Sequence, residues 1–396
     1  MDIKRVLKKI KKNLSKTNKP LLYVGIILFA LGLLNIVAAS STSSVSRYDY
    51  QLFYYTYKEA AFLLIGVAVF IYIINVSSKN YRIYTYLLLF IAFSTSITLS
   101  LVGSMHKGAQ NWINIFGFFK FQPSELGKIA IILGLAYCFD LYYKKMKEIK
   151  TITNQNYSIL GILAFIGLAL PIIVLTQKDL GTSLIMFFIT LVMFITSPFS
   201  RQFKSKIILF GMGTMVALVI FVISIGSQVL TATQFSRLTN FLNPCSSYET
   251  TGYQTCNSLI AINNGNIFGL GIGQSKQKYS YIPEAHTDSV FAIISEENGL
   301  IGGTAIFLAY LYIIKIILNI SKASTTIRGR YIALGVATYI FAHIFLNLGG
   351  LMAIIPLTGV PLPFFSYGGT YTISLIMGLA LVQRVHIETQ ESKERK

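Results

Sequence analysis

Asp288 is the acidic residue of this chain whose surroundings are least typical of a carboxylate. It stands where the polar segment 281–287 passes directly into a long apolar segment. A carboxylate at membrane depth is costly unless it is paired, hydrated or functional. Asp288 is therefore a candidate functional residue, in an enzyme or equally in a transporter. The alternative is a structural acid in the first turn of a helix that begins at Asp288, with Thr287 as N-cap and the helix dipole favouring negative charge.

Glu125 and Lys128 form a second candidate group, in the segment FQPSELGK at 121–128. Their i, i+3 spacing puts both side chains on one face of a helix, where they can pair. The functional alternative is that Lys128 points into a hydrated cavity and meets an anionic ligand. Asp179 is expected at the start of a helix, where an acid needs no function. Glu296 lies about 80° around its helix from Asp288, so the two need not share a pocket.

The segment 356–369, PLTGVPLPFFSYGG, contains three prolines and three glycines, which exclude a regular helix there. Non-helical backbone at membrane depth is tolerated only where it is buried in protein or lines a water-filled cavity. The end of this segment is therefore expected to form a cavity wall: Ser366, Tyr367, Gly368 and Gly369. His286 and His343 are expected to pack or to form hydrogen bonds rather than to act as catalysts. Three acids are expected to be ordinary outer-loop or helix-end charges: Asp49, Glu59 and Glu249.

The composition predicts an integral membrane protein. Of the 396 residues 54% are hydrophobic and only 12% are charged, against about 25% in a soluble domain. An all-α, polytopic fold with ten membrane-spanning helices is expected. The segment that begins at 288 is too long for one span and should protrude or tilt. The ten predicted spans are 20–39, 59–76, 83–103, 124–143, 158–176, 180–197, 206–228, 288–320, 329–352 and 364–384.

The distribution of positive charge predicts the orientation of the chain. With both termini in the cytoplasm, 25 of the 34 lysines and arginines fall on the cytoplasmic side. The net charge of +19 is thus explained by a membrane face rather than by nucleic-acid binding, and membrane lipids are the expected partners of that face. The expected regions are a basic cytoplasmic N-terminus (1–19), a transmembrane domain (20–385) and a cytoplasmic tail (386–396).

The loop 229–287, between the seventh and eighth spans, is too long for a connector and is expected to be functional and extracytoplasmic. It contains Cys245 and Cys256, which can form a disulfide in an oxidising environment, although their spacing does not establish one. The glycine-rich stretch 265–273 has no preceding strand, so it does not predict a dinucleotide site. No Cys/His spacing in the sequence is typical of zinc, and no metal ligand is assigned.

Six motifs occur in an order that resembles the shape, elongation, division and sporulation family. The resemblance covers the chain from the first span to the last. The motifs are GAQNWINI (108–115), FQPSELGK (121–128), DLGTS (179–183), IPEAHTD (282–288), SEENGLIGG (295–303) and PLPFFSYGG (361–369).

The resemblance implies a peptidoglycan glycosyltransferase that polymerises lipid II, the undecaprenyl-pyrophosphate-linked disaccharide-pentapeptide, on the outer membrane face. It also implies a class B penicillin-binding protein as partner. The essential acid of the family falls on Asp288. The other positions of the matching motifs are expected to contact substrate: Glu125, Lys128, Asp179, Lys120, Trp112, Gln122, Ser124, His286, Thr287, Ser366, Tyr367, Gly368 and Gly369.

The chain departs from the family pattern at a few of these positions. Asn111 stands where the family usually has an arginine, Lys178 where proline is common, and Ser289-Val290 interrupts the usual residues after the aspartate. A phosphate contact at position 111 is therefore in question. Lys107, Lys120 and Lys178 can compensate in charge, but an ammonium lacks the bidentate geometry of a guanidinium.

The expected mechanism assigns Asp288 as general base, because a carboxylate in a partly dry cavity is a stronger base. Lys128, oriented by Glu125, is expected on the side of the leaving pyrophosphate, and a divalent cation, Mg²⁺ or Mn²⁺, can assist there. The alternatives are a flippase for lipid-linked precursors and a scaffold that recruits the transpeptidase. Within the family, segment 257–278 favours the FtsW type, which implies the division septum and other divisome proteins, over the RodA type.

Overall fold

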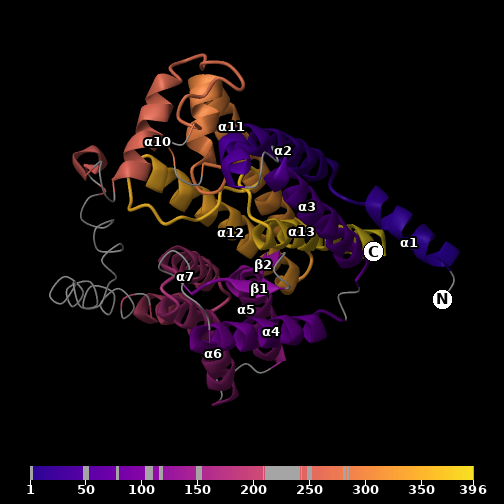
Figure 1. Ribbon diagram of the computed structural model, residues 1–396. Helices are drawn as coiled ribbons and strands as arrows, with labels where there is room; N and C mark the ends of the chain where they lie inside the picture. Colours follow the sequence, from indigo (N-terminus) through magenta and orange to yellow (C-terminus); the bar gives the residue numbers. More distant parts are fainter. Residues whose placement is uncertain are drawn as a thin grey trace.

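The computed structural model is a bundle of long helices, shown in Figure 1. The description that follows concerns residues 3–47, 53–76, 80–102, 110–115, 119–148, 154–207, 209, 241, 243–247, 252–279, 282 and 285–395. The helices of the first half are α1 (Ile3–Ser15), α2 (Lys19–Arg47), α3 (Tyr54–Asn75), α4 (Tyr81–Val102), α5 (Pro123–Glu148), α6 (Asn154–Thr176) and α7 (Leu180–Ile195). The second half contains η2 (Pro244–Ser247), α10 (Tyr253–Asn264), α11 (Val290–Ala323), α12 (Ile327–Leu351) and α13 (Thr370–Glu394).

Within the described residues, eight helices are long and apolar enough to cross a membrane: α2, α3, α4, α5, α6, α11, α12 and α13. The shorter apolar helix α7 corresponds to a ninth predicted span. The predicted all-α membrane fold is therefore confirmed. The predicted span 206–228 lies outside the described residues, apart from its first few positions, so the total of ten stays a prediction.

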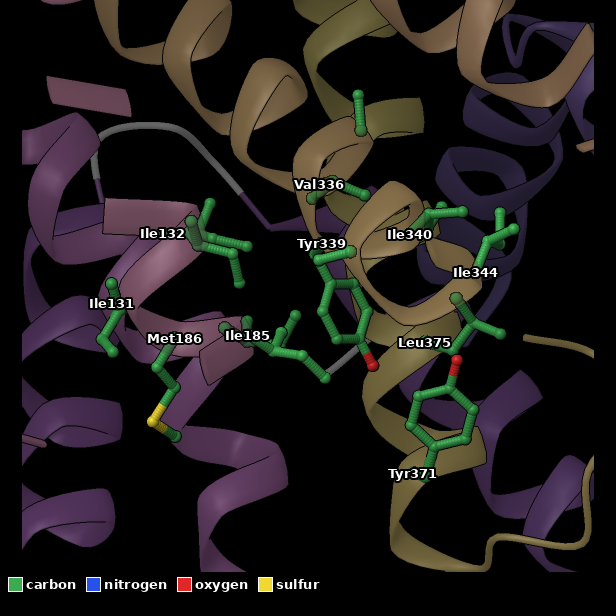
Figure 2. Packing of buried hydrophobic residues seen from close by; sticks show 14 of the residues in the cluster. Ile131, Ile132, Ile185, Met186, Val336, Tyr339, Ile340, Ile344, Tyr371 and Leu375 are labelled. Carbon is green, nitrogen blue, oxygen red and sulfur yellow. The ribbon is translucent and has the colours of Figure 1, made fainter. Parts of the chain in front are cut away.

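Helices α12 and α13 lie in the middle of the bundle, with α2, α3, α10 and α11 on one side and α4 to α7 on the other (Figure 1). In their apolar segments 78% and 83% of residues are buried, against 22% in α11, so α12 and α13 face protein whereas α11 largely faces lipid. The bundle interior is filled by apolar side chains from α5, α7, α12 and α13, including Ile132, Met186, Tyr339 and Leu375 (Figure 2). A polar side chain on α5, α12 or α13 is thus held inside the protein.

The two ends of the chain lie together. The ammonium of Lys16, just after α1, is 2.5 Å from a carboxylate oxygen of Glu394 at the end of α13. The backbone N–H of Asn18 donates to the side chain of Gln383 at 2.7 Å. Both termini therefore lie at the same end of the bundle (Figure 1), which agrees with an even number of membrane crossings.

Helix α11 is interrupted at Gly299, which has a left-handed backbone (φ 65°, ψ −166°). A short buried helix ends at the break and a longer, more exposed helix follows, so the overlong segment 288–320 is not one continuous helix. That the segment protrudes from the membrane or tilts in it stays a prediction. The helix also begins at Val290 rather than at Asp288, and Ser289, not Thr287, is its N-cap residue.

The glycine-rich loop 265–273 packs against this break. The N–H groups of Leu270 and Gly271 donate to the carbonyls of Glu296 and Glu297, both at 2.9 Å. In return, the N–H groups of Leu300 and Ile301 donate to the carbonyls of Asn266 and Ile267, at 2.9 and 3.2 Å. A Cβ atom on Gly299 would lie 2.4 Å from the backbone of the loop, so the close approach requires glycine there.

The segment 352–369 between α12 and α13 is non-helical, as its prolines and glycines predict. Gly359 and Gly369 have positive φ angles (70° and 51°), and so does Phe364 (φ 71°), a conformation that is strained for a non-glycine residue. Because of this segment α13 begins at Thr370 instead of 364, and it continues to Glu394 instead of ending near 384.

A short antiparallel hairpin precedes α5. Its strands are β1 (Ile113–Ile115) and β2 (Phe119–Phe121), with Ile113 opposite Phe121 and Asn114 opposite Lys120. The hairpin joins the start of α13, because the hydroxyl of Thr370 donates to the carbonyl of Lys120 at 3.2 Å. The hairpin therefore links the loop before α5 to the beginning of the last helix.

Candidate active site

Asp288 lies in the turn before α11 and is only partly buried. Its Oδ2 accepts a hydrogen bond from Nε2 of Gln254 at 3.0 Å, and its Oδ1 accepts one from the hydroxyl of Thr287 at 3.1 Å. Its backbone carbonyl accepts from Nδ2 of Asn347 at 2.7 Å. A partly exposed carboxylate that is held in place by such hydrogen bonds can still reach a ligand. This environment suits an acid that accepts a proton.

Gln254 comes from α10, within the long loop, and its Nε2 also donates to the hydroxyl of Ser289 at 3.0 Å. A disulfide joins Cys245 of η2 to Cys256 of α10, two residues beyond Gln254. The disulfide that the sequence left open is therefore present in the structure. It constrains the part of the loop that supplies a direct partner of Asp288.

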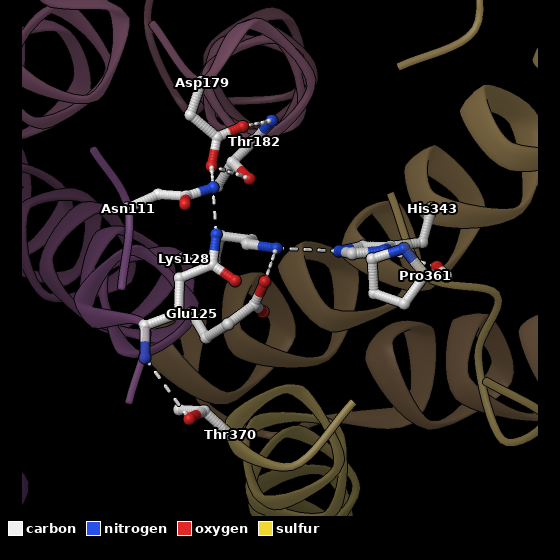
Figure 3. Close-up of polar contacts among 9 residues, drawn as sticks. Asn111, Glu125, Lys128, Asp179, Thr182, His343, Pro361 and Thr370 are labelled. Atoms are coloured by element: carbon white, nitrogen blue, oxygen red, sulfur yellow. Dashed lines mark hydrogen bonds and ion pairs between the residues drawn. The ribbon is translucent and has the colours of Figure 1, made fainter. Parts of the chain in front are cut away.

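Lys128 lies at the centre of a second polar group inside the bundle, shown in Figure 3. Its ammonium is 2.8 Å from Oε1 of Glu125 and 2.9 Å from Nε2 of His343, and its side chain is fully buried. The structure therefore shows the ion pair within one helix. In this conformation burial prevents Lys128 from contacting a ligand in a hydrated cavity.

The second carboxylate oxygen of Glu125, Oε2, has no hydrogen-bond partner among the described residues, although Glu125 is 1% exposed. The hydroxyl of the neighbouring Ser124 is likewise buried without a described partner. Buried polar atoms of this kind are costly and occur preferentially at functional sites. The group around Lys128 is thus only partly satisfied in this conformation.

Helix α12 connects the two polar groups. His343 binds Lys128 through Nε2 and lies 3.0 Å from the carbonyl of Pro361 through Nδ1. One turn later, Asn347 donates to the carbonyl of Val360 at 2.8 Å as well as to that of Asp288. Residues four apart lie on the same helix face. One face of α12 therefore holds segment 360–361 between the Lys128 pair and Asp288.

Asp179 is the N-cap residue of α7 and belongs to a separate network in Figure 3. Its oxygens accept from the backbone and hydroxyl of Thr182 at 3.1 and 3.0 Å, from Asn111 at 2.9 Å and from Gln122 at 3.0 Å. The predicted position at a helix start is confirmed. Asn111, which replaces the family's arginine, is thus a neutral donor to Asp179.

The hairpin and the first turn of α5 carry other predicted site residues. Lys120 on β2 is exposed, and Trp112, directly before β1, is partly buried. The backbone N–H of Gln122 donates to the hydroxyl of Thr370 at 3.3 Å, so Gln122 joins α13 as well as Asp179. These residues surround the Asp179 network rather than Asp288.

The SYGG segment (366–369) is held by Glu59, an acid whose place in the sequence predicts an ordinary outer-loop or helix-end charge. That interpretation is wrong. Glu59 on α3 is 3% exposed, and its Oε2 accepts from the backbone N–H groups of Gly368 and Gly369 at 3.3 and 3.4 Å, while Oε1 accepts from the hydroxyl of Thr372. A carboxylate of one helix thus binds the N-terminal donors of another, where negative charge is favoured.

His286 lies two residues before Asp288 and is buried against aromatic rings. The ring centroids of His286 and Tyr55 are 4.2 Å apart, and those of Tyr55 and Tyr367 are 5.1 Å apart. The N–H of Tyr367 donates to the carbonyl of His286 at 2.8 Å. The hydroxyl of Ser366 accepts from the N–H of Leu362 at 2.7 Å. Helix α3 therefore supports both the SYGG segment and the turn that carries Asp288.

Glu296 and Glu297 do not contact Asp288 and bind the long loop instead. Glu296 accepts from the hydroxyl of Ser275 at 2.5 Å and from the N–H of Gln277 at 3.2 Å. Glu297 is 3.3 Å from the ammonium of Lys278. The expectation that these acids are separate from Asp288 agrees with this geometry.

Four residues that complete these contacts are not among the site residues predicted from the sequence: Glu59, Gln254, His343 and Asn347. The expectation that His343 packs or forms hydrogen bonds agrees with its contact to Lys128. His343 and Asn347 had a detectable signal, because they are polar residues at i, i+4 in an otherwise apolar segment. Gln254 had none, because its contact with Asp288 depends on how the long loop folds back.

A divalent cation at Asp288 would need most of its ligands from elsewhere. In the part of the chain that the structure describes, no three His, Cys, Asp or Glu residues are close enough to form a metal site. Asp288 offers one partly exposed carboxylate, whereas Mg²⁺ prefers an octahedral set of oxygens that often includes phosphates and water. The residues present fit a cation held jointly by Asp288 and a phosphate-bearing ligand.

Comparison with known proteins assigns the chain to a family. The family model described as cell cycle protein, FtsW/RodA/SpoVE, matches residues 18–391. The chain is 32% identical to stage V sporulation protein E of Bacillus subtilis (strain 168), covering 93% of this chain and 97% of that protein. It is also 32% identical to a probable peptidoglycan glycosyltransferase FtsW of Wigglesworthia glossinidia brevipalpis, covering 95% of both chains.

Solved structures share the fold. A chain from a structure described as "Structural coordination of polymerization and crosslinking by a peptidoglycan synthase complex" matches with a TM-score of 0.74 at 22% identity, covering 94% of this chain and 98% of that one. The rod shape determining protein RodA of Thermus thermophilus matches with a TM-score of 0.65 at 21% identity, covering 93% of this chain and 96% of that one. Taken with the six motifs and the helical bundle, these matches show that the chain belongs to the FtsW/RodA/SpoVE family of membrane proteins.

Proposed function

We propose that this protein is a peptidoglycan glycosyltransferase that polymerises lipid II into glycan strands. Asp288 acts as general base in this proposal. Its carboxylate accepts the proton of the acceptor sugar's 4-hydroxyl while that oxygen bonds to the anomeric carbon of the donor. The bond from that carbon to the pyrophosphate breaks with inversion, and the lipid pyrophosphate leaves with the electron pair. Relatives named peptidoglycan glycosyltransferase, at about 30% identity over nearly the whole chain, support the reaction class.

The observation that carries the role of Asp288 is its combination of partial exposure and tight support. Both carboxylate oxygens accept hydrogen bonds, and its backbone is fixed by Asn347 on the buried helix α12. Of the acids in the site, Glu59, Glu125 and Glu296 are each almost fully buried. Asp288 is thus the acid best placed to meet a lipid-borne sugar, and its geometry is held by a rigid element.

Positive charge on the leaving-group side is proposed to come from three lysines. Lys120 and Lys178 are exposed and adjoin the Asp179 network, so they can contact the pyrophosphate directly. Lys128 is buried, so unless the bundle opens it stabilises the leaving pyrophosphate only through its electrostatic field. The buried Oε2 of Glu125, which has no hydrogen-bond partner among the described residues, favours such an opening. In the open state the other predicted substrate contacts, which include Ser124 and the SYGG segment, would face the substrate.

We propose that a divalent cation takes part, which the carboxylate of Asp288 would help to hold together with phosphate oxygens of the substrate. When bound, such an ion polarises phosphate oxygens and stabilises the leaving group. Activity should then be lost on chelation and return with Mg²⁺ or Mn²⁺. Because substrate supplies ligands, the ion should bind weakly to the protein alone.

The test is polymerisation of lipid II by the purified protein with a class B penicillin-binding protein present. Asp288→Asn keeps the size of the side chain but removes its basicity, and it should lower the rate by about 10²–10⁴-fold, the usual contribution of a general base. Asp140→Asn is the matched control. Asp140 lies in the second half of α5, away from Glu125 and Lys128, and pairs with Lys144. Normal polymerisation by Asp288→Asn would refute the assignment.

A flippase for lipid-linked precursors is the second candidate function. The observation that favours it is the buried group of Lys128, Glu125 and His343 at the centre of the bundle, because charges inside a membrane protein also mark permeation paths. A flippase would move labelled lipid II across vesicles without forming glycan chains. Polymer formed in detergent, where no compartments exist, would exclude transport as the sole activity.

The partner and cellular site are proposed from family membership. A penicillin-binding transpeptidase is the proposed partner, in keeping with the synthase complex whose structure shares this fold. Relatives named FtsW favour a role in division together with other divisome proteins. A fluorescent fusion should therefore concentrate at the septum, and a side-wall distribution would instead indicate the RodA type.

A further inference from the structure

The glycine-rich loop 265–273 exposes an apolar tip. Phe268 and Ile272 are 82% and 83% exposed, and Ile267 is 56% exposed. The nine residues GNIFGLGIG contain no charged side chain. Large apolar groups exposed together on a segment outside the spanning helices are unusual, and they mark a surface that meets lipid or protein.

The backbone of this loop fixes where the tip lies. Asn266 and Ile267 accept hydrogen bonds from Leu300 and Ile301, the first residues of the second part of α11. Leu300 and Ile301 are themselves 66% and 56% exposed and begin an exposed apolar face that continues through Leu308 and Tyr312. The tip is therefore continuous with the face of α11 that meets the bilayer.

The length of α11 places the tip at the level of the membrane boundary. The roughly 24 residues from Leu300 to Ala323 extend ~36 Å, whereas the hydrocarbon core is ~30 Å thick. Lys322, in the last turn, marks the far interface. Leu300 and the loop paired with it therefore lie within about one helical turn of the hydrocarbon on the other side.

We propose that the apolar tip of loop 265–273 inserts into the adjacent bilayer leaflet and anchors the short helix that carries Asp288. The mechanical link is direct. The loop binds the carbonyls of Glu296 and Glu297 at one end of that helix, and the side chains of the same two residues hold Ser275 and Lys278 beyond the tip. Asp288 directly precedes the other end. Insertion of the tip thus sets the depth of the carboxylate relative to the lipid surface.

Spin labelling of the full-length protein tests this placement. Cys138 is buried and Cys245 is bonded to Cys256, so a nitroxide on Phe268→Cys reports from one site. In phosphatidylcholine–phosphatidylglycerol liposomes the label should collide more with oxygen than with a water-soluble nickel chelate. Leu308→Cys, on the lipid-facing side of α11, is the positive control, and Lys276→Cys is the aqueous control.

Two results would overturn the proposal. A label at position 268 that behaves like one at position 276 would place the tip in water. A label shielded from both reagents, either alone or after addition of a penicillin-binding transpeptidase, would place the tip against protein. The measurement needs no enzymatic activity, so it is independent of the proposed function.

A second measurement tests the link to Asp288 and does rest on the proposed function. Phe268→Asp combined with Ile272→Asp should lower lipid II polymerisation about tenfold in liposomes, because carboxylates resist entry into the bilayer. The same variant should lose less activity in detergent micelles, and Phe268→Leu with Ile272→Leu should behave as wild type in both. Equal losses in liposomes and micelles would contradict the anchoring role, whereas inactive wild-type protein would refute the polymerase assignment instead.

Discussion

At the scale of single residues, the site separates into one accessible acid and several buried polar groups. Asp288 is partly exposed, whereas Lys128, Glu125 and His343 are enclosed by the bundle. Removing one partner of a buried ion pair leaves an uncompensated charge, whereas removing both can be nearly neutral. The Glu125–Lys128 pair is therefore expected to be sensitive to single substitutions and tolerant of a matched double one.

A double-mutant cycle measures this sensitivity. Glu125→Leu and Lys128→Met should each lower the free energy of unfolding by about 3–5 kcal/mol, and the double variant should lose much less than their sum. Thermal unfolding of the purified protein in detergent provides the readout. Strictly additive losses would show that the pair is not energetically coupled.

Substitution of Glu59 is also expected to lower the stability of the protein, for a different reason from substitution of the Glu125–Lys128 pair. Its carboxylate satisfies two backbone N–H groups and one hydroxyl at the start of α13. Glu59→Gln replaces an acceptor with an NH₂ donor, so at least one of these donors loses its partner, at a cost of about 1–3 kcal/mol. We expect a lower unfolding temperature and reduced polymerisation.

Glu388→Gln is the control for Glu59→Gln. Glu388 also accepts a hydrogen bond from within the bundle, from Arg384 at 3.0 Å, but it lies at the opposite end of α13. It should therefore leave polymerisation nearly unchanged. An equal loss of activity in both variants would argue against a specific role of Glu59 near the SYGG segment.

At the scale of elements, three segments without regular helix structure determine how the site is built. The break in α11 and the glycine-rich loop meet at one end of the short helix that begins at Val290, whereas segment 352–369 meets the turn that carries Asp288 at its other end, where α3 and α12 support it. Their glycines serve close backbone approach. A Cβ on Gly269 would lie 2.2 Å from the carbonyl oxygen of Glu297, and one on Gly265 would lie 2.0 Å from that of Ser295.

Gly299→Ala tests the break in α11. Gly299 has φ 65° and ψ −166°, a region essentially confined to glycine, so alanine there costs about 1–3 kcal/mol, and its Cβ would also overlap the backbone of the loop. The loop should detach, and proteolysis within 265–279 should become faster. Gly161→Ala is the control, since nothing lies within 4 Å of a Cβ there and alanine favours a helix interior. Unchanged proteolysis of Gly299→Ala would contradict the close packing of loop and helix.

At the scale of the whole molecule, α12 extends from one end of the bundle to the other. Near its beginning, the hydroxyl of Tyr331 donates to the carbonyl of Thr196 after α7, and near its end Asn347 binds Asp288. These two positions are about 24 Å apart along the helix. The chain between Thr196 and Asp288 therefore passes from one end of the bundle to the other, as the predicted span 206–228 requires.

The predicted orientation leads to a topology experiment. Reporters fused to either terminus should read as cytoplasmic, and a reporter or a labelled cysteine at position 276 should read as extracytoplasmic. The physical reason is the excess of lysine and arginine on one face of the membrane. Reporters that place the two termini on opposite sides would contradict both the even number of spans and the contact between Lys16 and Glu394.

The sequence by itself determined the features that follow from composition and local pattern. Apolar segment lengths predicted the helical membrane fold, prolines and glycines predicted the non-helical segment before α13, and the spacing of Glu125 and Lys128 predicted that they could pair. The motifs pointed to Asp288 and to the family. Each of these depends on neighbours within a few positions of the chain, or on transfer of a segment into lipid, and so needs no knowledge of tertiary contacts.

Only the tertiary structure decided which residues complete the site. Glu59 has the same local sequence appearance as a helix-end charge, yet α13 brings three donors to it from about 310 positions away along the chain. Gln254 and His343 become partners of Asp288 and Lys128 only because a loop folds back and two helices pack together. The break at Gly299 likewise lies where loop 265–273 pairs with the helix backbone, a contact between segments about 30 positions apart that local sequence does not reveal.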